Sequence, residues 1–281
     1  MPELPEAQTI AAQLDRCLRG VRLGRVVLRL RKIARCNGTT LSATLPGRSV
    51  RRVTRRGKRV VVTLDPEATL VFRLGMTGQI MVTDADARRD RHVHLRVSLD
   101  DGRRELRYRD VRRFGSVWLT EGAGREGPDG IDDLGPEPLE ITPAQFDRLL
   151  SRRRQIKALL LDQRAIAGLG NIYCDEALFA ARIHPLTPAA EIDRPRRHAL
   201  LRAIRRILRQ AIRHGGSTVR DYRTATGREG NFQTRHRVYG RQGQPCPRCH
   251  APIQRITAAG RSTHICPTCQ TRVFRPAVES L

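Results

Sequence analysis

The chain opens on Met1-Pro2-Glu3-Leu4-Pro5-Glu6, where two carboxylates and two prolines precede any hydrophobic periodicity. The small Pro2 behind Met1 predicts removal of the initiator methionine, which would leave a secondary amine at the terminus. An α-amino group titrates near 8, roughly 2 units below a lysine, so part of it is neutral and nucleophilic at neutral pH. Such an amine can attack a sugar or carbonyl carbon to give an iminium, with Glu3 and Glu6 as nearby acid and base groups. Alternatively, the hexapeptide is a helix lead-in whose glutamates only favour the positive helix end.

Four of the seven cysteines form two close pairs near the C-terminus, Cys246-Pro247-Arg248-Cys249 and Cys266-Pro267-Thr268-Cys269, separated by 16 residues. Two such turns can supply four thiolates in a tetrahedron, the arrangement of a structural zinc site. Four protein ligands leave no open coordination position, so we expect one structural Zn²⁺. A redox dithiol would not require both pairs.

The net charge is +25, from 53 Lys and Arg against 28 Asp and Glu, which indicates a polyanionic partner. Nucleic acid fits best. A membrane surface is the alternative, but no apolar run approaches the roughly 18 residues of a spanning helix. No apolar leader follows Met1, and the paired cysteines suit a reducing compartment. We therefore expect a cytoplasmic, nucleoid-associated monomer that does not bind membranes.

The hydrophobic pattern changes character along the chain. A helix is predicted over residues 7–18, with Cys17 on its apolar stripe and hence in the core. Short strands are predicted at 26–30, 60–64, 70–74, 94–99 and 117–119, which favours an antiparallel sandwich or barrel. Residues 122–138 are rich in Gly, Pro and Asp and mark a domain boundary. Helices are predicted over 142–154, from Ile156, from Asn171 and over about 188–214, and a hairpin tip at 259–263.

Three basic or glycine-flanked segments could contact nucleic acid. Six of the nine residues in Arg51-Arg52-Val53-Thr54-Arg55-Arg56-Gly57-Lys58-Arg59 are basic, which favours phosphate contacts over a merely solvated strand. Met76 lies in Arg73-Leu74-Gly75-Met76-Thr77-Gly78, and Phe114 in Asp110-Val111-Arg112-Arg113-Phe114-Gly115. Apolar residues of these types are more often core residues, but the flanking glycines favour loops.

These motifs together resemble those of bacterial formamidopyrimidine-DNA glycosylases from Pro2 to about Cys269. The shared features are the Pro-Glu-Leu-Pro-Glu opening, the Met and Arg-Phe loops, the turn Ala167-Gly168-Leu169-Gly170-Asn171 and the paired cysteines. The resemblance implies an α+β multidomain fold: an N-terminal antiparallel β-sandwich with an N-terminal helix, then a helix-two-turn-helix domain with a zinc-ribbon finger. The implied domains are 1–122 (catalytic), 123–140 (linker), 141–236 (helix-two-turn-helix) and 237–281 (finger and tail).

The same resemblance implies that the chain would excise 8-oxoguanine and formamidopyrimidines from damaged double-stranded DNA and cleave the abasic site. Pro2 would be the nucleophile, aided by Glu3, Glu6 and Lys58. Met76, Arg112 and Phe114 would fill the space left by the flipped base, which suits chemistry that must first extrude a base. The resemblance further makes Lys157, Asn171 and Arg261 phosphate contacts. Arg73 and Val111 depart from the family's usual His and Pro.

Two other functions are compatible with parts of this pattern. The sister glycosylase for oxidised pyrimidines shares the nucleophile, the helical turn and the finger, but Leu4 and the Met76, Arg112 and Phe114 set favour the purine enzyme. A non-catalytic damage-binding zinc-finger protein would need neither Glu3 nor a free terminal amine. The resemblance further implies that residues 217–239 would close over the flipped base, with no role assigned to individual side chains.

Overall fold

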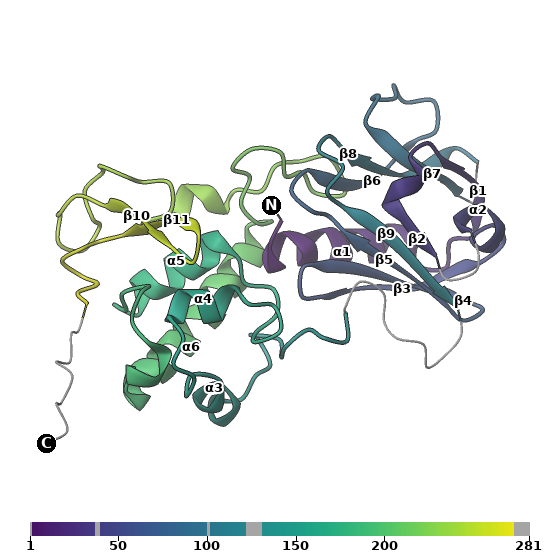
Figure 1. The fold of residues 1–281 in the computed structure, drawn as a ribbon. Helices are drawn as coiled ribbons and strands as arrows, with labels where there is room; N and C mark the ends of the chain where they lie inside the picture. Colours follow the sequence, from purple (N-terminus) through teal and green to yellow (C-terminus); the bar gives the residue numbers. More distant parts are fainter. Residues whose placement is uncertain (1, 37–39, 100–101, 122–130, 273–281) are drawn as a thin grey trace, which may run out of the picture. The chain divides into compact units, whose positions relative to one another are not determined.

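The structure is a computed structural model that describes residues 2–36, 40–99, 102–121 and 131–272 (Figure 1). It divides into two compact units, Met1–Leu134 with Arg209–Thr234 and Gly135–Leu208 with Arg235–Leu281. The first unit is therefore completed by a segment from the C-terminal half of the chain. Most of the predicted linker, residues 123–130, and most of the predicted tail, residues 273–281, lie outside the described residues.

The first helix, α1, spans Leu4–Leu18 and begins three residues before the predicted start at Ala7. Glu3 is its N-cap and forms a capping box with Glu6, which satisfies backbone N–H groups that the first turn leaves without helical partners. Pro5 lies in the first turn, where its missing N–H costs no hydrogen bond. The second half of the hexapeptide, residues 4–6, is thus already helical, because Pro5 and the two glutamates suit a helix start.

One face of α1 is buried in the first unit's core, through Ile10, Leu14 and Leu18. Cys17 is exposed, so the prediction that it belongs to the core is wrong. It lies one position outside the stripe that packs inward, which the spacing of apolar residues alone does not resolve.

Two sheets enclose that core (Figure 1). The five-stranded sheet has the order β2 (Ala34–Cys36), β9 (Ser116–Glu121), β5 (Ala68–Arg73), β4 (Arg59–Asp65), β3 (Ser49–Arg56). The four-stranded sheet has the order β1 (Leu23–Leu28), β7 (Val93–Leu99), β8 (Arg104–Asp110), β6 (Gly78–Asp84). All pairs are antiparallel except β2 with β9. The 3₁₀ helix η1 (Arg31–Ile33) and the short helix α2 (Leu41–Thr44) lie between strands. The predicted antiparallel sandwich is confirmed.

Four strands of these two sheets were not predicted from the sequence: β2, β3, β6 and β8. Arginines obscure the alternation in β3 and β8, since a long guanidinium side chain can occupy either face of a sheet. In β8, Arg107 is 3% exposed and donates to the carboxylate of Glu105 at 3.0 Å and to backbone carbonyl groups. A buried arginine thus replaces the apolar residue that the pattern requires.

The returning segment 209–234 packs on the sandwich, although its residues beyond 216 show no periodicity. Tyr222 and Ala225 join the core, and the backbone N–H of Ala225 donates to Gln13 of α1 at 2.9 Å. The carbonyl of Ala225 in turn accepts from the N–H of Val82. A short turn, η4 (Phe232–Arg235), follows.

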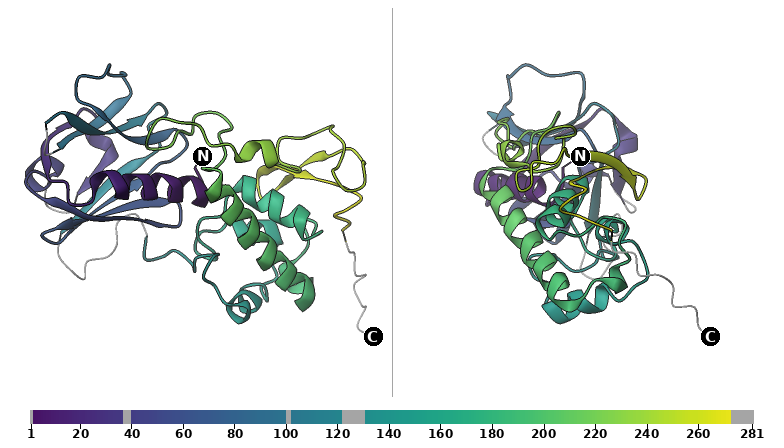
Figure 2. Two further views of the ribbon diagram at one scale, coloured as in Figure 1. Left: turned by 180° about the vertical axis from the view of Figure 1, so that it is seen from behind. Right: turned by 90° about the vertical axis from the view of Figure 1, so that its left-hand side faces the viewer.

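The second unit consists of helices and a small hairpin (Figures 1 and 2). Its elements are α3 (Pro143–Leu149), α4 (Ile156–Leu161), α5 (Asn171–Ala180), η3 (Ala189–Glu191), most of the long α6 (Arg194–Arg213), and the strands β10 (Gln254–Ala258) and β11 (Arg261–Ile265). Two predicted helix boundaries are wrong. The helix predicted over 142–154 ends at Leu149. The helix predicted from about 188 begins at Arg194, because Asp193 accepts the N–H of Arg196 at 2.8 Å and so caps α6. The hairpin tip predicted at 259–263 is shorter in the structure and consists of Ala259 and Gly260, because Ala258 pairs with Arg261.

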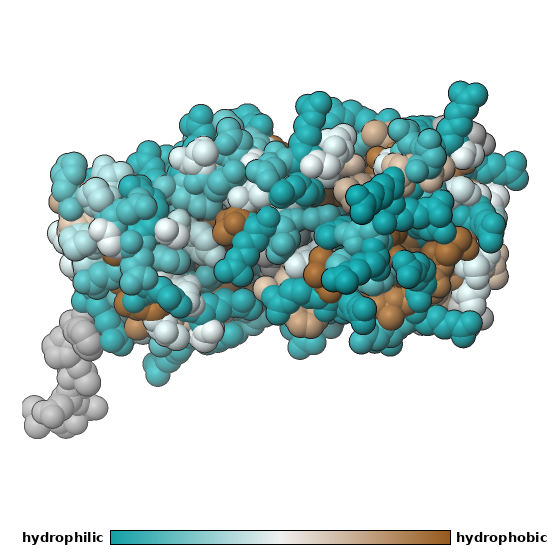
Figure 3. Space-filling view, turned by 90° about the horizontal axis from the view of Figure 1, so that it is seen from above, coloured by the Kyte–Doolittle hydropathy of each residue, from teal (hydrophilic) through white to brown (hydrophobic). Residues whose placement is uncertain are grey.

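Hydrophilic residues cover most of the face seen in Figure 3. Within the described ranges, every helix is too short or too polar to cross a membrane.

Candidate functional site

The first unit buries the N-terminal residues. Pro2 is buried, and Glu3 and Glu6 are 3% and 1% exposed. The backbone N–H of Glu3 donates to Oε2 of Glu6 at 2.8 Å. The glutamates therefore do cap the helix, as the helix lead-in interpretation predicts. The same hydrogen bonds hold the two carboxyl groups in place within a few residues of Pro2. Capping and chemistry are compatible uses of one geometry.

Glu6 also holds a segment that is distant in sequence. Its Oε1 accepts the backbone N–H of Ser217 at 2.7 Å. Gly216 has a φ of +82°, and a Cβ there would lie 2.7 Å from that Oε1. The hydroxyl of Tyr222 donates to the carbonyl of Gly215 at 3.0 Å, and burial, together with Glu6, raises the pKa of this tyrosine. The sequence analysis gave neither Gly215 nor Gly216 a role in the site.

Lys58 lies in a two-residue turn. Arg56 pairs with Arg59 at the end of β3 and β4, which leaves Gly57 and Lys58 as the turn. Gly57 has a φ of +56°, a conformation that favours glycine. Lys58 is half-buried. The basic run predicted from the sequence is therefore one strand, this turn and the start of the next strand.

Met76, Arg112 and Phe114 come together on the first unit. Met76 is 40% and Phe114 56% exposed, so neither is a core residue. The Arg112 guanidinium carbon lies 4.6 Å from the centroid of the Phe114 ring, and its Nη1 lies 2.9 Å from the sulfur of Met76. Large exposed apolar side chains on adjoining loops indicate contact with a ligand.

A buried carboxylate fixes these two loops. Asp110, which is fully buried, accepts the N–H of Gly115 at 2.8 Å and the hydroxyl of Thr77. Thr77 in turn accepts the N–H of Arg112 at 2.9 Å. At Gly75 a Cβ would lie 2.7 Å from the carbonyl carbon of Phe114, so only glycine fits there.

In the second unit, the structure corrects the expected role of Lys157. Its side chain is 0% exposed, and its Nζ donates at 2.6 Å both to Oδ1 of Asp175 and to the hydroxyl of Thr263. The other oxygen of Asp175 accepts the N–H of His264 at 2.9 Å. An ammonium enclosed in this way presents no exposed surface to a phosphate in this structure.

The other two expected phosphate contacts lie beside this ion pair. Asn171 begins α5 and donates through Nδ2 to the carbonyl of Ser262 at 2.8 Å, while its buried Oδ1 accepts no hydrogen bond from the residues that the structure describes. Arg261 is exposed at the start of β11, next to Gly260 with a φ of +68°. Arg261 is thus an exposed guanidinium on a hairpin that Lys157, Asp175 and Asn171 hold in place.

The four paired cysteines converge as predicted: the sulfurs of Cys246, Cys249, Cys266 and Cys269 all lie within 4.8 Å of one another. Three sulfur pairs are separated by 3.4, 3.5 and 3.9 Å. A tetrahedron with Zn–S bonds of about 2.3 Å requires separations of about 3.8 Å, so the residues fit a structural zinc site. Backbone N–H groups of Arg248 and Cys269 point at two of the sulfurs at 3.4 Å.

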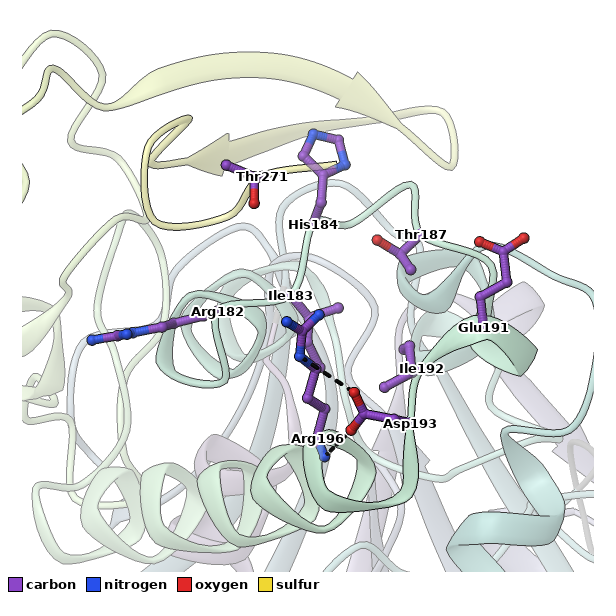
Figure 4. A pocket seen from close by; sticks show the side chains of 9 residues that line it. All are labelled: Arg182, Ile183, His184, Thr187, Glu191, Ile192, Asp193, Arg196 and Thr271. Carbon is purple, nitrogen blue, oxygen red and sulfur yellow. Dashed lines mark hydrogen bonds and ion pairs between the residues drawn. The ribbon is translucent and has the colours of Figure 1, made fainter. Parts of the chain in front are cut away.

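A separate cavity of about 220 Å³ lies in the second unit, where the segment after α5 and the start of α6 approach the end of the finger (Figure 4). Its lining mixes both charges, and Asp193 pairs with Arg196 at 3.6 Å. The predicted site residues all lie outside it.

Three family models match consecutive parts of the chain. They are the formamidopyrimidine-DNA glycosylase N-terminal domain at residues 1–117, the H2TH domain of the same enzyme at residues 134–223, and the zinc finger found in FPG and IleRS at residues 243–272. The matches thus cover both units and the cysteine site.

Relatives match over almost the full length. The formamidopyrimidine-DNA glycosylase of Chloroflexus aurantiacus is 44% identical, covering 98% of this chain and 100% of the relative. The crystal structure of the MutM (Fpg) protein of Thermus thermophilus is 41% identical with a TM-score of 0.86, covering 96% of this chain and 98% of that one. A point mutant of Lactococcus lactis FPG, solved with DNA containing Fapy-dG, is 34% identical with a TM-score of 0.88, covering 96% and 100%.

Proposed function

Because the chain belongs to the formamidopyrimidine-DNA glycosylase family, we propose that it is a base-excision-repair DNA glycosylase with abasic-site lyase activity. Its substrates are 8-oxoguanine and formamidopyrimidines in double-stranded DNA. The observation that carries the proposal is the set of family matches across both units. The buried, capped N-terminus and the exposed Met76, Arg112 and Phe114 cluster support it, because the reaction requires both a nucleophile and a plug.

The Pro2 nitrogen attacks C1′ of the flipped nucleotide, and the bond from C1′ to the base breaks, with the base leaving as it is protonated. Glu3 protonates the opening sugar ring, which yields an iminium between Pro2 and C1′. The iminium acidifies the neighbouring C–H bonds, so that elimination on both sides expels the 3′ and 5′ phosphates. Glu6 orients the terminus through its hydrogen bond to Glu3, and Lys58 stabilises the phosphate side.

Met76 and Phe114 fill the hole in the duplex and Arg112 donates to the base opposite the lesion. Flipping costs a few kcal/mol of stacking and pairing, which these contacts offset. Arg261 and Asn171 contact the phosphates. Lys157 is a positioning residue, because its buried ion pair with Asp175 fixes the hairpin that carries Arg261.

The zinc ion holds the finger together and takes no part in bond breaking. The partner is damaged double-stranded DNA, and we propose that the protein acts as a cytoplasmic, nucleoid-associated monomer without membrane association. We propose the functional division 1–122 (catalytic), 123–140 (linker), 141–236 (helix-two-turn-helix) and 237–281 (finger and tail), in which residues 209–234 belong to the DNA-binding part although they pack with the first compact unit.

Borohydride trapping tests the chemistry directly, because reduction of the iminium gives a stable crosslink. Wild-type protein and Pro2→Gly are compared on a duplex with one 8-oxoguanine opposite cytosine and on a duplex with an oxidised pyrimidine. We expect a purine-dependent crosslink that maps to the Pro2 nitrogen. Trapping mainly on the pyrimidine lesion would assign the sister activity instead. Salt-sensitive binding without any trapping would leave a non-catalytic damage-binding protein.

A further inference from the structure

A basic hollow lies on the first unit, away from the residues assigned to chemistry. It has a volume of about 460 Å³ and is lined by Arg19, Arg51, Arg52 and Thr63. Arg19 follows the last turn of α1, where the negative end of the helix dipole favours cations. The other three residues come from β3 and β4.

An irregularity in β3 directs two of these arginines to solvent. Val50 pairs with Leu64 and Arg52 with Thr63, so Arg51 is an extra residue on one strand, a β-bulge. Consecutive residues of a regular strand point to opposite faces, whereas a bulge can re-aim a side chain. Arg51 and Arg52 are accordingly both exposed, between the buried Val50 and Val53. Because β3 is the edge strand of its sheet, the hollow is open to a large partner.

The charge of the hollow is only partly offset. Asp15 binds Arg19 through Oδ2 and the N–H of Val53 through Oδ1, the latter at 2.7 Å. Among the residues that the structure describes, no hydrogen bond or ion pair engages the guanidinium of Arg51 or Arg52. Arg52 interacts with Asp15 only by longer-range electrostatic attraction. Three guanidiniums against one carboxylate suit an anion with several oxygens.

The hollow lies far from Pro2 and Lys58, as the lengths of α1 and of the hairpin between β3 and β4 show. The 15 residues of α1 span about 22 Å at 1.5 Å per residue, with Pro2 before one end and Arg19 after the other. From Arg51 to Lys58 the hairpin runs about 23 Å at 3.3 Å per residue. Arg55 donates to Gln8 at 3.0 Å and Val53 to Asp15, so β3 and α1 run in opposite directions and the hollow lies at the far end of both.

We propose that this hollow binds backbone phosphates of a second double-stranded DNA segment while the catalytic site holds the first. The inference rests on the proposed function, which makes duplex DNA the protein's polyanion. A shallow, open site lined by guanidiniums suits phosphates that project from a duplex backbone. Holding two segments at once allows the protein to transfer between them without full release into solution.

The test uses the full chain with its catalytic site covalently filled. Borohydride-trapped complex on an unlabelled 8-oxoguanine duplex is purified and titrated with a fluorescent, undamaged duplex over a series of salt concentrations. The variant is Arg51→Thr with Arg52→Thr, since threonine suits an edge strand. The control is Arg88→Thr with Arg89→Thr, an adjacent arginine pair in the same unit with the same change in charge.

We expect the wild-type trapped complex to bind the second duplex and the Arg51/Arg52 variant to bind it more weakly. The slope of log affinity against log salt should fall by about 2, as two phosphate contacts are removed. Trapping yield should be unchanged in all three proteins. Failure to trap would refute the proposed function itself. Normal trapping with no second binding by wild type, or equal losses in the variant and the control, would refute the second site.

Discussion

Replacing Gly216 with alanine should damage both stability and catalysis through Glu6. The residue has a φ of +82°, which costs an L-residue about 1–2 kcal/mol. The new Cβ would also lie 2.7 Å from Oε1 and 2.9 Å from Cγ of Glu6, closer than non-bonded atoms can approach. Either Glu6 or the segment must move, and the hydrogen bond from the N–H of Ser217 is then lost.

The loss of stability in Gly216→Ala can be separated into backbone strain and the collision with Glu6. A hydrogen bond to a charged acceptor contributes about 1.5–3 kcal/mol, so the collision should add about 2 kcal/mol to the backbone strain. Gly227→Ala supplies the matched control, because Gly227 has a φ of +78° but no heavy atom of the described chain within 4 Å of an added Cβ. Gly227→Ala should therefore show the backbone strain alone.

Urea unfolding measures stability, and single-turnover excision with borohydride trapping measures chemistry. Gly216→Ala should unfold with about 2 kcal/mol less stability than Gly227→Ala, the contribution of the lost hydrogen bond. Its trapping rate should fall by about 10- to 100-fold, since a displaced Glu6 no longer holds the terminus and small misplacements are costly. Equal stability and equal trapping rates in the two variants would refute the role assigned to the contact between Glu6 and Ser217.

Four further substitutions test the DNA contacts and the pH dependence of stability. Phe114→Ala should weaken binding to lesion duplex by about 1–3 kcal/mol, the usual contribution of a stacked aromatic, with little change on undamaged duplex in a parallel titration. Lys157→Met should weaken DNA binding and lower the salt slope only through Arg261, so in a double-mutant cycle its loss of affinity should not add to that of Arg261→Ala; a double variant whose slope falls by about a further 0.9 below that of Arg261→Ala would indicate a direct phosphate contact of Lys157 instead. Asp175→Asn should behave like Lys157→Met, with zinc content unchanged. Burial lowers the pKa of His236 to about 4, whereas the pKa of a histidine in the unfolded chain is about 6.5. Between pH 4 and 6.5, roughly, the folded state therefore binds fewer protons than the unfolded state. The free energy of unfolding should fall as the pH falls from about 6.5 to about 4. His236→Phe should flatten that part of the pH profile of the urea midpoint, and an unchanged profile would contradict the assignment.

Local chemistry made part of the site predictable. The cysteine sulfurs converge because each pair forms its own turn and four thiolates satisfy one zinc ion. Met76 and Phe114 could be placed in loops because glycines flank both segments. The strands β3 and β8 were missed where arginines replace the apolar alternation, and only the tertiary structure shows that Arg107 is buried against Glu105.

Contacts between distant residues were not predictable. Glu6 and Ser217 are 211 positions apart, and the Lys157 ammonium finds Asp175 and Thr263 at separations of 18 and 106. A lysine among apolar residues in α4 looks like a solvent-exposed or ligand-binding group until its buried partner is known. The family resemblance gave its position but not its environment, so the burial of its ammonium against Asp175 and Thr263 could not be foreseen.

The two units use the same device to present exposed groups. In the first, buried Asp110 fixes the loops that expose Met76 and Phe114. In the second, Asp175 binds the hairpin behind the exposed Arg261.

The next residue, Glu176, extends this arrangement to the segment that leads into the finger. It accepts the N–H groups of Arg237, Val238 and Tyr239 at 2.9–3.0 Å, although burial raises its pKa. Buried carboxylates are costly unless every oxygen is hydrogen-bonded, so each of these networks favours a single loop conformation over its alternatives. The side chains proposed to enter a duplex are therefore held on a fixed backbone, and little ordering remains to oppose binding.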